Sequence, residues 1–100
     1  MYTTPADAPC CMKFDEAETY AAALDAHGHT DWRLPTKPEL NVLFDNRAAI
    51  RGFDESGSPT AGFYWSATPN DGWNAWCQRF SDGYQVNLHK DGHSSVRLVR

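Results

Sequence analysis

Hydrophobic residues change their spacing midway along the chain. In the first half, apolar side chains recur every three or four residues, as on one face of a helix: Phe14, Ala17, Tyr20, Ala21 and Leu24. Asp15 is a suitable N-cap, Glu18 follows it three residues later, and Gly28 lies just beyond the pattern. These signals predict a helix over residues 15–27.

A second helix is indicated by a stronger start signal. Thr36 and Glu39 have the spacing of a capping box, and Pro38 falls in the expected first turn. An apolar stripe follows at helical spacing: Leu40, Leu43 and Phe44. The sequence therefore predicts a helix over residues 37–46.

After Gly62 the hydrophobic residues follow the period of two that is typical of strands. Four short segments are rich in aromatic and β-branched residues: 63–66, 75–80, 84–89 and 95–100. Each gap between them contains Asp-Gly, a dipeptide typical of hairpin turns. We expect the last three segments to form a small antiparallel meander on which the two helices pack, which is an α+β fold.

Length and charge narrow the class of protein. A chain of 100 residues is enough for one small domain, so we expect a single domain over residues 1–100. The formal net charge of −4 argues against direct binding of nucleic acid or of an anionic membrane. The chain has no apolar run that could span a membrane and no secretion signal at its start. We expect a cytoplasmic monomer, extracellular only if exported by another route or associated with a virion.

The excess of acidic residues lies in the helical half. Residues 1–50 contain eight acids and four bases, whereas residues 51–100 contain five of each. The first predicted helix carries four acids without a base: Asp15, Glu16, Glu18 and Asp25. Such a run is most often a solvated helix face. The alternative is an acidic patch that binds a protein partner with a basic surface.

The cysteines do not predict a disulfide framework. There are three, Cys10, Cys11 and Cys77, and the two neighbours in the chain would form a strained pair. We therefore expect reduced thiols. A bridge from Cys10 or Cys11 to Cys77 is the alternative if the chain is exported.

Histidines occur in two places where a metal site has to be considered. His27 and His29 precede Asp31 between the predicted helices, and His89 and His93 flank the last turn. None of these spacings is that of a zinc site, so we expect no metal and no other cofactor. The sequence also lacks a phosphate-binding glycine-rich loop and a nucleophile with an identifiable base, which predicts a protein that is not an enzyme.

The four tryptophans divide into two groups. Trp32 and Trp65 are expected in the core, because a two-layer domain needs large side chains that reach across it. For Trp73 and Trp76 a core position and an exposed position fit the sequence equally well. Trp73 lies beside an Asp-Gly turn, where side chains often carry recognition.

Several motifs, in order, resemble those of the Lcl C-terminal-like family. They are Asp31-Trp32-Arg33-Leu34-Pro35-Thr36 with Glu39-Leu40, Tyr64-Trp65-Ser66-Ala67-Thr68, Ala75-Trp76, Phe80-Ser81-Asp82-Gly83 and Val96-Arg97-Leu98-Val99-Arg100. The resemblance covers residues 14–100. It implies an α+β fold related to C-type lectins and formylglycine-generating enzymes, and a role as a binding module, in some members for sulfated glycans.

Two hypotheses follow for the function. The favoured one is a non-enzymatic inhibitor or adaptor that blocks a protein partner, such as a phage-encoded anti-CRISPR protein, because the negative charge is concentrated and a secretion signal is missing. Its contacts are the four acids of the first predicted helix. The alternative is a module that binds a glycan or a cell-surface ligand through the strand half. Its predicted contacts are Asn70, Asp71, Trp73, Trp76, Tyr84, His89 and His93.

Overall fold

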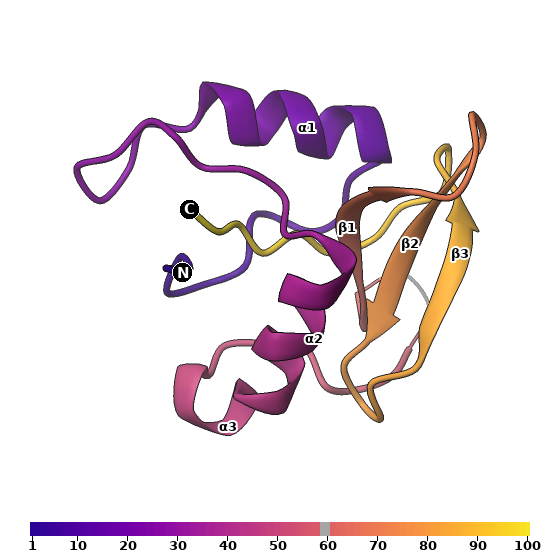
Figure 1. Ribbon diagram of the computed structural model, residues 1–100. Helices are drawn as coiled ribbons and strands as arrows, with labels where there is room; N and C mark the ends of the chain where they lie inside the picture. The colour runs from indigo at the N-terminus through magenta and orange to yellow at the C-terminus, as the bar shows by residue number, and fades with distance from the viewer. Residues whose placement is uncertain (59–60) are drawn as a thin grey trace.

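The computed structural model describes residues 1–58 and 61–100. It contains the helices α1 (Phe14–Ala23), α2 (Lys37–Asp45) and α3 (Arg47–Ile50) and the strands β1 (Phe63–Pro69), β2 (Asn74–Arg79) and β3 (Gln85–His89). The strands form one antiparallel sheet in the order β1-β2-β3, which confirms the predicted α+β class. Figure 1 shows α1 and α2 on different sides of the molecule, with the sheet beside them. Among the described residues, no helix has the length and apolar character that crossing a membrane requires.

The start of α1 lies one residue before the predicted one. Asp15 lies inside the first turn and does not cap the helix. Instead, Glu16 Oε1 accepts a hydrogen bond from the backbone N–H of Lys13 at 2.9 Å. The buried face of α1 agrees with the predicted stripe and consists of Phe14, Ala17 and Ala21.

The end of α1 comes four residues earlier than predicted. The helix stops at Ala23, and Ala26 and His29 pair through two backbone hydrogen bonds of 3.1 and 3.0 Å. The two residues between them, His27 and Gly28, have φ angles of 54° and 78°. This is a tight turn that glycine favours, so Gly28 marks that turn and not the end of the helix.

α2 begins where the sequence predicts. Thr36 Oγ1 accepts from the N–H of Glu39 at 3.3 Å, and Glu39 Oε1 accepts from the N–H of Thr36 at 2.9 Å, so the capping box is complete. Pro38 lies in the first turn. The single turn of α3 follows after Asn46 and was not predicted, so the described residues form three helices and not two.

The sheet consists of the first three predicted strand segments, and the prediction of a meander from the last three is wrong. Turns at the first two Asp-Gly dipeptides connect β1 to β2 and β2 to β3, as predicted. The register places Trp65 opposite Cys77 and Trp76 opposite Asn87. The last segment, 95–100, is not a strand of this sheet, although Ser95 at its start bridges to Tyr64 of β1 in parallel.

The last segment pairs mainly with the N-terminal strap, which we define as residues 2–12, and Val99 also pairs with Arg33. Backbone hydrogen bonds join Tyr2 N–H to Arg100 O at 2.9 Å and Ala8 N–H to Val96 O at 2.9 Å. Alternating β-branched residues predict extended backbone but do not identify its partner. The strap has no strand pattern of its own, so this pairing could not be predicted from hydrophobic spacing.

Two apolar clusters form the core. The first includes Phe14, Trp32, Leu34, Trp65, Ala75, Cys77, Val96 and Leu98. The second lies against α2 and consists of Leu40, Leu43, Tyr64, Phe80 and Val99. Trp32 and Trp65 are 6% and 0% exposed, so their predicted core positions are confirmed.

The cysteines correct another expectation. Cys10 and Cys11, neighbours in the strap, are joined as a disulfide, whereas we expected reduced thiols. Cys77 is free and buried, so the alternative bridge from the strap to Cys77 is absent as well. In the folded chain Cys77 lies in the first apolar cluster, away from Cys10 and Cys11.

Candidate functional site

The sheet tip, where the turns 70–74 and 89–92 meet, carries the most exposed tryptophan of the described chain. Figure 1 shows these turns together at one end of the sheet. Trp73 is 72% exposed, yet its backbone is held on both sides. Asp71 Oδ1 accepts from the N–H groups of Trp73 and Asn74 at 2.7 and 2.9 Å. Trp73 O accepts from the N–H of Lys90 at 2.8 Å, so a rigid backbone presents the exposed ring.

The ring of Trp73 stacks with the ring of His89. Their centroids are 6.3 Å apart and their planes differ by 23°. His89 Nδ1 accepts a hydrogen bond from the N–H of Asp91 at 3.2 Å. A neutral imidazole that accepts at Nδ1 carries its proton on Nε2, so His89 presents an N–H donor there. We call these two rings the platform.

The platform continues along one face of the sheet. Asn74 lies opposite His89 and Trp76 lies opposite Asn87, and alternation places all four side chains on the same face. Trp76 is only partly exposed, and Lys37 Nζ lies 3.5 Å from the centre of its ring. Lys37 belongs to the first turn of α2, so α2 covers Trp76 and leaves Trp73 open.

The structure separates the residues that were predicted to bind a ligand. Asn70, Asp71 and Trp73 lie at the sheet tip, and His89 and the exposed His93 flank the second turn there. Tyr84, which is 56% exposed, lies at the opposite end of the sheet, just before β3. At that end the Arg79 guanidinium lies 5.3 Å from the centre of the Tyr84 ring and pairs with Asp82.

Sequence reasoning missed Asn74, Lys90 and Asp91 at the tip. Asp71 accepts from backbone N–H groups two and three residues later, which is an Asx turn, and Asn74 Nδ2 also donates to its carboxylate. These hydrogen bonds hold the pKa of Asp71 below its usual range. The Asp-x-Trp-Asn spacing is the signal that could have predicted this turn.

The acidic residues of the other predicted site do not form one patch. Asp15 and Glu16 lie beside one hollow next to α1, Glu18 lies beside another, and Asp25 lies beyond the helix end. All four are exposed, and none forms an ion pair with any residue that the structure describes. Their pattern agrees with the solvated helix face that the sequence also allowed.

Hollows flank α1 on two sides. One of about 490 Å³ is lined by Glu18, Ala22 and Trp32, among others. Another of about 530 Å³ includes Asp15 and Glu16 in its lining. The acids of α1 therefore lie at the rims of two separate depressions.

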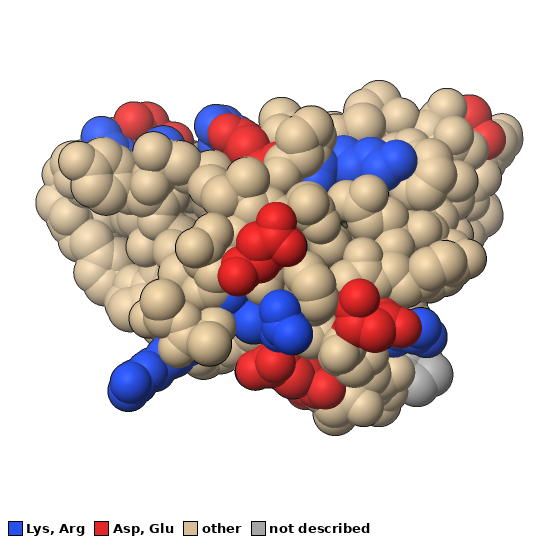
Figure 2. Space-filling view, turned by 60° about the horizontal axis from the view of Figure 1, so that its bottom comes forward, with Lys and Arg blue, Asp and Glu red and all other residues tan. Residues whose placement is uncertain are grey.

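Elsewhere some acidic and basic side chains are paired. Figure 2, which brings the lower side of Figure 1 forward, shows both signs of charge close together over that face. Arg33 donates to both carboxylate oxygens of Glu39, at 2.6 and 2.8 Å. This contact lowers the pKa of Glu39 to about 2.

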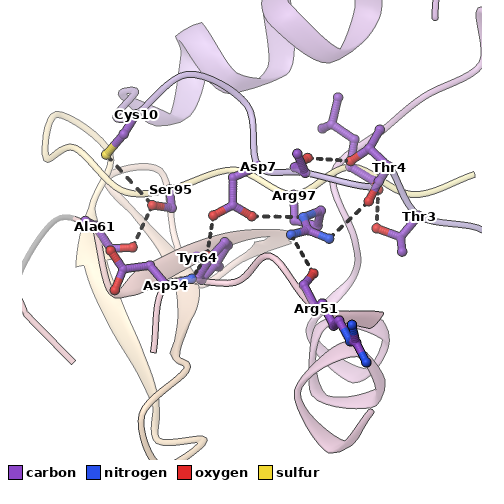
Figure 3. Close-up of polar contacts among 12 residues, drawn as sticks. Thr3, Thr4, Asp7, Cys10, Arg51, Asp54, Ala61, Tyr64, Ser95 and Arg97 are labelled. Atoms are coloured by element: carbon purple, nitrogen blue, oxygen red, sulfur yellow. Dashed lines mark hydrogen bonds and ion pairs between the residues drawn. The ribbon is translucent and has the colours of Figure 1, made fainter. Parts of the chain in front are cut away.

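The most buried charge belongs to Arg97, whose side chain is 0% exposed. Its guanidinium donates to Asp7 Oδ1 at 2.9 Å, to Thr4 O at 3.0 Å and to Arg51 O at 3.1 Å (Figure 3). Tyr64 donates to the other oxygen of Asp7. We call this set the Arg97 network; it joins the strap, the sheet and the last segment.

Burial acts on the titratable groups of the Arg97 network and on Cys77. Burial raises the pKa of Asp7, although hydrogen bonds from Tyr64 and Arg97 oppose that shift. Burial also raises the pKa of Tyr64 and that of the Cys77 thiol, so neither is a ready nucleophile at neutral pH. Among residues 1–58 and 61–100, no group of three or more His, Cys, Asp or Glu side chains is placed to hold a metal ion.

Comparisons with known proteins agree with the motifs of the sequence. No curated protein matches the chain. A family model described as the Lcl C-terminal domain matches residues 2–100. Because this match includes the strap, both helical regions and the whole sheet, the chain belongs to the Lcl C-terminal domain family.

Proposed function

We propose that this protein is a non-enzymatic recognition module that binds a glycan at the platform. The observation that carries the proposal is the exposed ring of Trp73 on a backbone fixed by Asp71 and Lys90. Aromatic rings bind with little loss of conformational freedom, and a fixed backbone reduces that loss further. Apart from its stacking with His89, the Trp73 ring is turned to solvent and lies outside both apolar clusters.

The glycan is favoured over other ligands because of what surrounds the ring. Sugars combine a face of C–H groups with hydroxyl groups, and they need an apolar surface next to polar side chains. His89 and Asn74 supply polar groups on the same face of the sheet. The family resemblance, with its implied relation to C-type lectins and formylglycine-generating enzymes, supports the same proposal by analogy of fold.

A glycan array with Trp73→Ala and Tyr84→Ala variants tests the proposal. Both residues are large exposed aromatics, but they lie at opposite ends of the sheet, so Tyr84→Ala is a matched control. We expect the wild type to bind a set of glycans that Trp73→Ala loses, with affinity lowered about tenfold or more. Tyr84→Ala should bind as the wild type does. Equal binding by all three proteins would contradict the platform as the site.

A second candidate is an inhibitor that blocks a protein with a basic surface, including a phage-encoded anti-CRISPR protein. It is favoured by one observation, the exposed acids of α1 without ion pairs inside the described chain. Capture from a bacterial lysate, read by mass spectrometry, tests it. An Asp15→Lys, Glu18→Lys protein should lose the captured partner, whereas Asp45→Lys, which changes an exposed acid of α2, should keep it. Equal capture by both variants would contradict a role for α1.

A further inference from the structure

We infer that the platform binds an uncharged sugar ring, whose C–H face lies on Trp73 and one of whose oxygens accepts a hydrogen bond from Nε2–H of His89. This inference rests on the proposed function and deepens it. It differs from the sulfated glycans that the family resemblance implies. Three features of the sheet tip carry it: the overlap of the two rings, the tautomer of His89 and the charges around them.

The two rings overlap only in part. Rings stacked face to face are closer than the 6.3 Å between the centroids of Trp73 and His89, although the planes are nearly parallel. The offset agrees with the 72% exposure of Trp73. A large part of the indole face therefore remains open beside the edge of the imidazole. This arrangement suits a ligand that needs an apolar surface and a polar edge together.

The edge of the imidazole offers a donor. Nδ1 of His89 is occupied by the N–H of Asp91, which places the proton on Nε2. The His89 side chain is 54% exposed, so that donor is not buried against the sheet. Hydroxyl and ring oxygens of a sugar accept hydrogen bonds from such a group.

The charges near the platform disfavour an anionic ligand. Asp71 accepts from the backbone N–H of Trp73, and an Asp91 carboxylate oxygen lies 3.8 Å from Nδ1 of His89, so both bring a negative charge to the tip. Lys90 offsets part of this charge, because it helps to lower the pKa of Asp71, but two carboxylates face one lysine there. Lys37 lies over the ring of Trp76, and Lys90 Nζ lies 4.9 Å from the ring centre of Phe14. A sulfated sugar would meet two carboxylates there, and like charges repel at short range.

Two substitutions of His89 separate stacking from hydrogen bonding. His89→Phe keeps an aromatic ring beside Trp73 and removes the donor, whereas His89→Gln removes the ring and keeps an N–H donor at a similar distance from the backbone. Binding is measured by isothermal titration calorimetry with methyl β-D-galactopyranoside, methyl β-D-glucopyranoside and a heparin tetrasaccharide. Thermal melting of each variant checks the fold, since both changes are at an exposed position.

We expect at least one of the two uncharged glycosides to bind and the heparin fragment not to bind. His89→Phe should weaken the binding of the glycoside about 3- to 10-fold, which is the effect of one lost hydrogen bond. His89→Gln should recover part of that loss of affinity. If the binding of a glycoside requires Trp73 but is unchanged by His89→Phe, this inference is overturned and the proposed function stands. Binding of heparin and of neither glycoside would also overturn it. Failure of the wild type and Trp73→Ala to differ on any glycan would instead overturn the proposed function.

Discussion

The Arg97 network and the platform place polar and aromatic side chains in opposite surroundings. In the network, a guanidinium, a carboxylate and a phenol are buried and satisfy one another's hydrogen bonds. At the platform, an indole and an imidazole are exposed, and backbone hydrogen bonds hold them in place. The comparison teaches that the role of a polar or aromatic side chain in this fold depends on its surroundings. What matters is whether neighbours bury it and satisfy its hydrogen bonds, and not which residue type it is.

The comparison predicts that the largest loss of stability comes from the network. Arg97→Ala leaves Asp7 without its buried partner and removes donors from Thr4 O and Arg51 O. We expect the free energy of unfolding to fall by about 3–5 kcal/mol, as for other broken buried ion pairs. Urea unfolding followed by circular dichroism measures it. A loss below about 1 kcal/mol would mean that the network contributes little.

A smaller loss is expected from one hydroxyl group of the network. Tyr64→Phe removes the donor to Asp7 and the acceptor of the Asp54 N–H, while the ring keeps its place among its aromatic neighbours. The expected cost is about 1–3 kcal/mol, because both former partners lose a hydrogen bond. The same urea titration applies. Arg97→Ala, Tyr64→Phe should cost less than the sum of the single changes, since they share Asp7.

The half-exposed ion pair of Arg33 and Glu39 is expected to affect stability less than the Arg97 network does and more than the platform does. Because the pKa of Glu39 is lowered to about 2, the pair stabilises the folded state above the unfolded pKa, and that contribution is lost as the pH falls from about 4.5 toward 2. Solvent screening limits the effect to about 1 kcal/mol or less. Glu39→Gln should be less stable than the wild type at pH 7, and the difference should disappear toward pH 2. A difference that is independent of pH would contradict this.

The smallest effect on stability is expected at the platform. Trp73→Ala should change the free energy of unfolding by no more than about 0.5 kcal/mol, because the ring is exposed and its backbone contacts remain. The matched buried change, Trp65→Ala, should cost about 3–5 kcal/mol in the same titration. Similar losses in the two variants would place Trp73 in the packing of the domain.

Local signals in the sequence predicted the parts of the fold that depend on neighbours in the chain. Thr36 and Glu39 are three residues apart, so their capping box was predictable, and so were the Asp-Gly turns between strands. Gly28 misled because a tight turn and a helix end both use glycine with positive φ. Local patterns do not distinguish these two uses.

Contacts between distant residues could not be predicted in the same way. Asp7 and Arg97 are 90 positions apart, and nothing in the strap indicates a partner for the last segment. The partial burial of Trp76 was equally undetermined, because it depends on Lys37 of α2, which lies over its ring. Sequence reasoning therefore predicted four residues that lie together at the tip: Asn70, Asp71, Trp73 and His89. It also included Tyr84, because the alternation of residues along a strand does not show at which end of the sheet a residue lies.

The pairing of the strap with the last segment has a practical consequence for how the domain can be held. Tyr2 and Arg100 exchange two backbone hydrogen bonds of 2.9 Å, so positions 2 and 100 are neighbours in space. Figure 1 shows them on the side away from the sheet tip. A tether attached at either position leaves Trp73 facing the solution, so a biotin tag at one end of the chain presents the tip outward on a sensor surface. Because the two ends are adjacent, a short linker can join them, and the chain can be opened in an exposed turn to give a circular permutant. When the opening is in a turn of the sheet tip, the new ends, and with them a tether, lie at the tip.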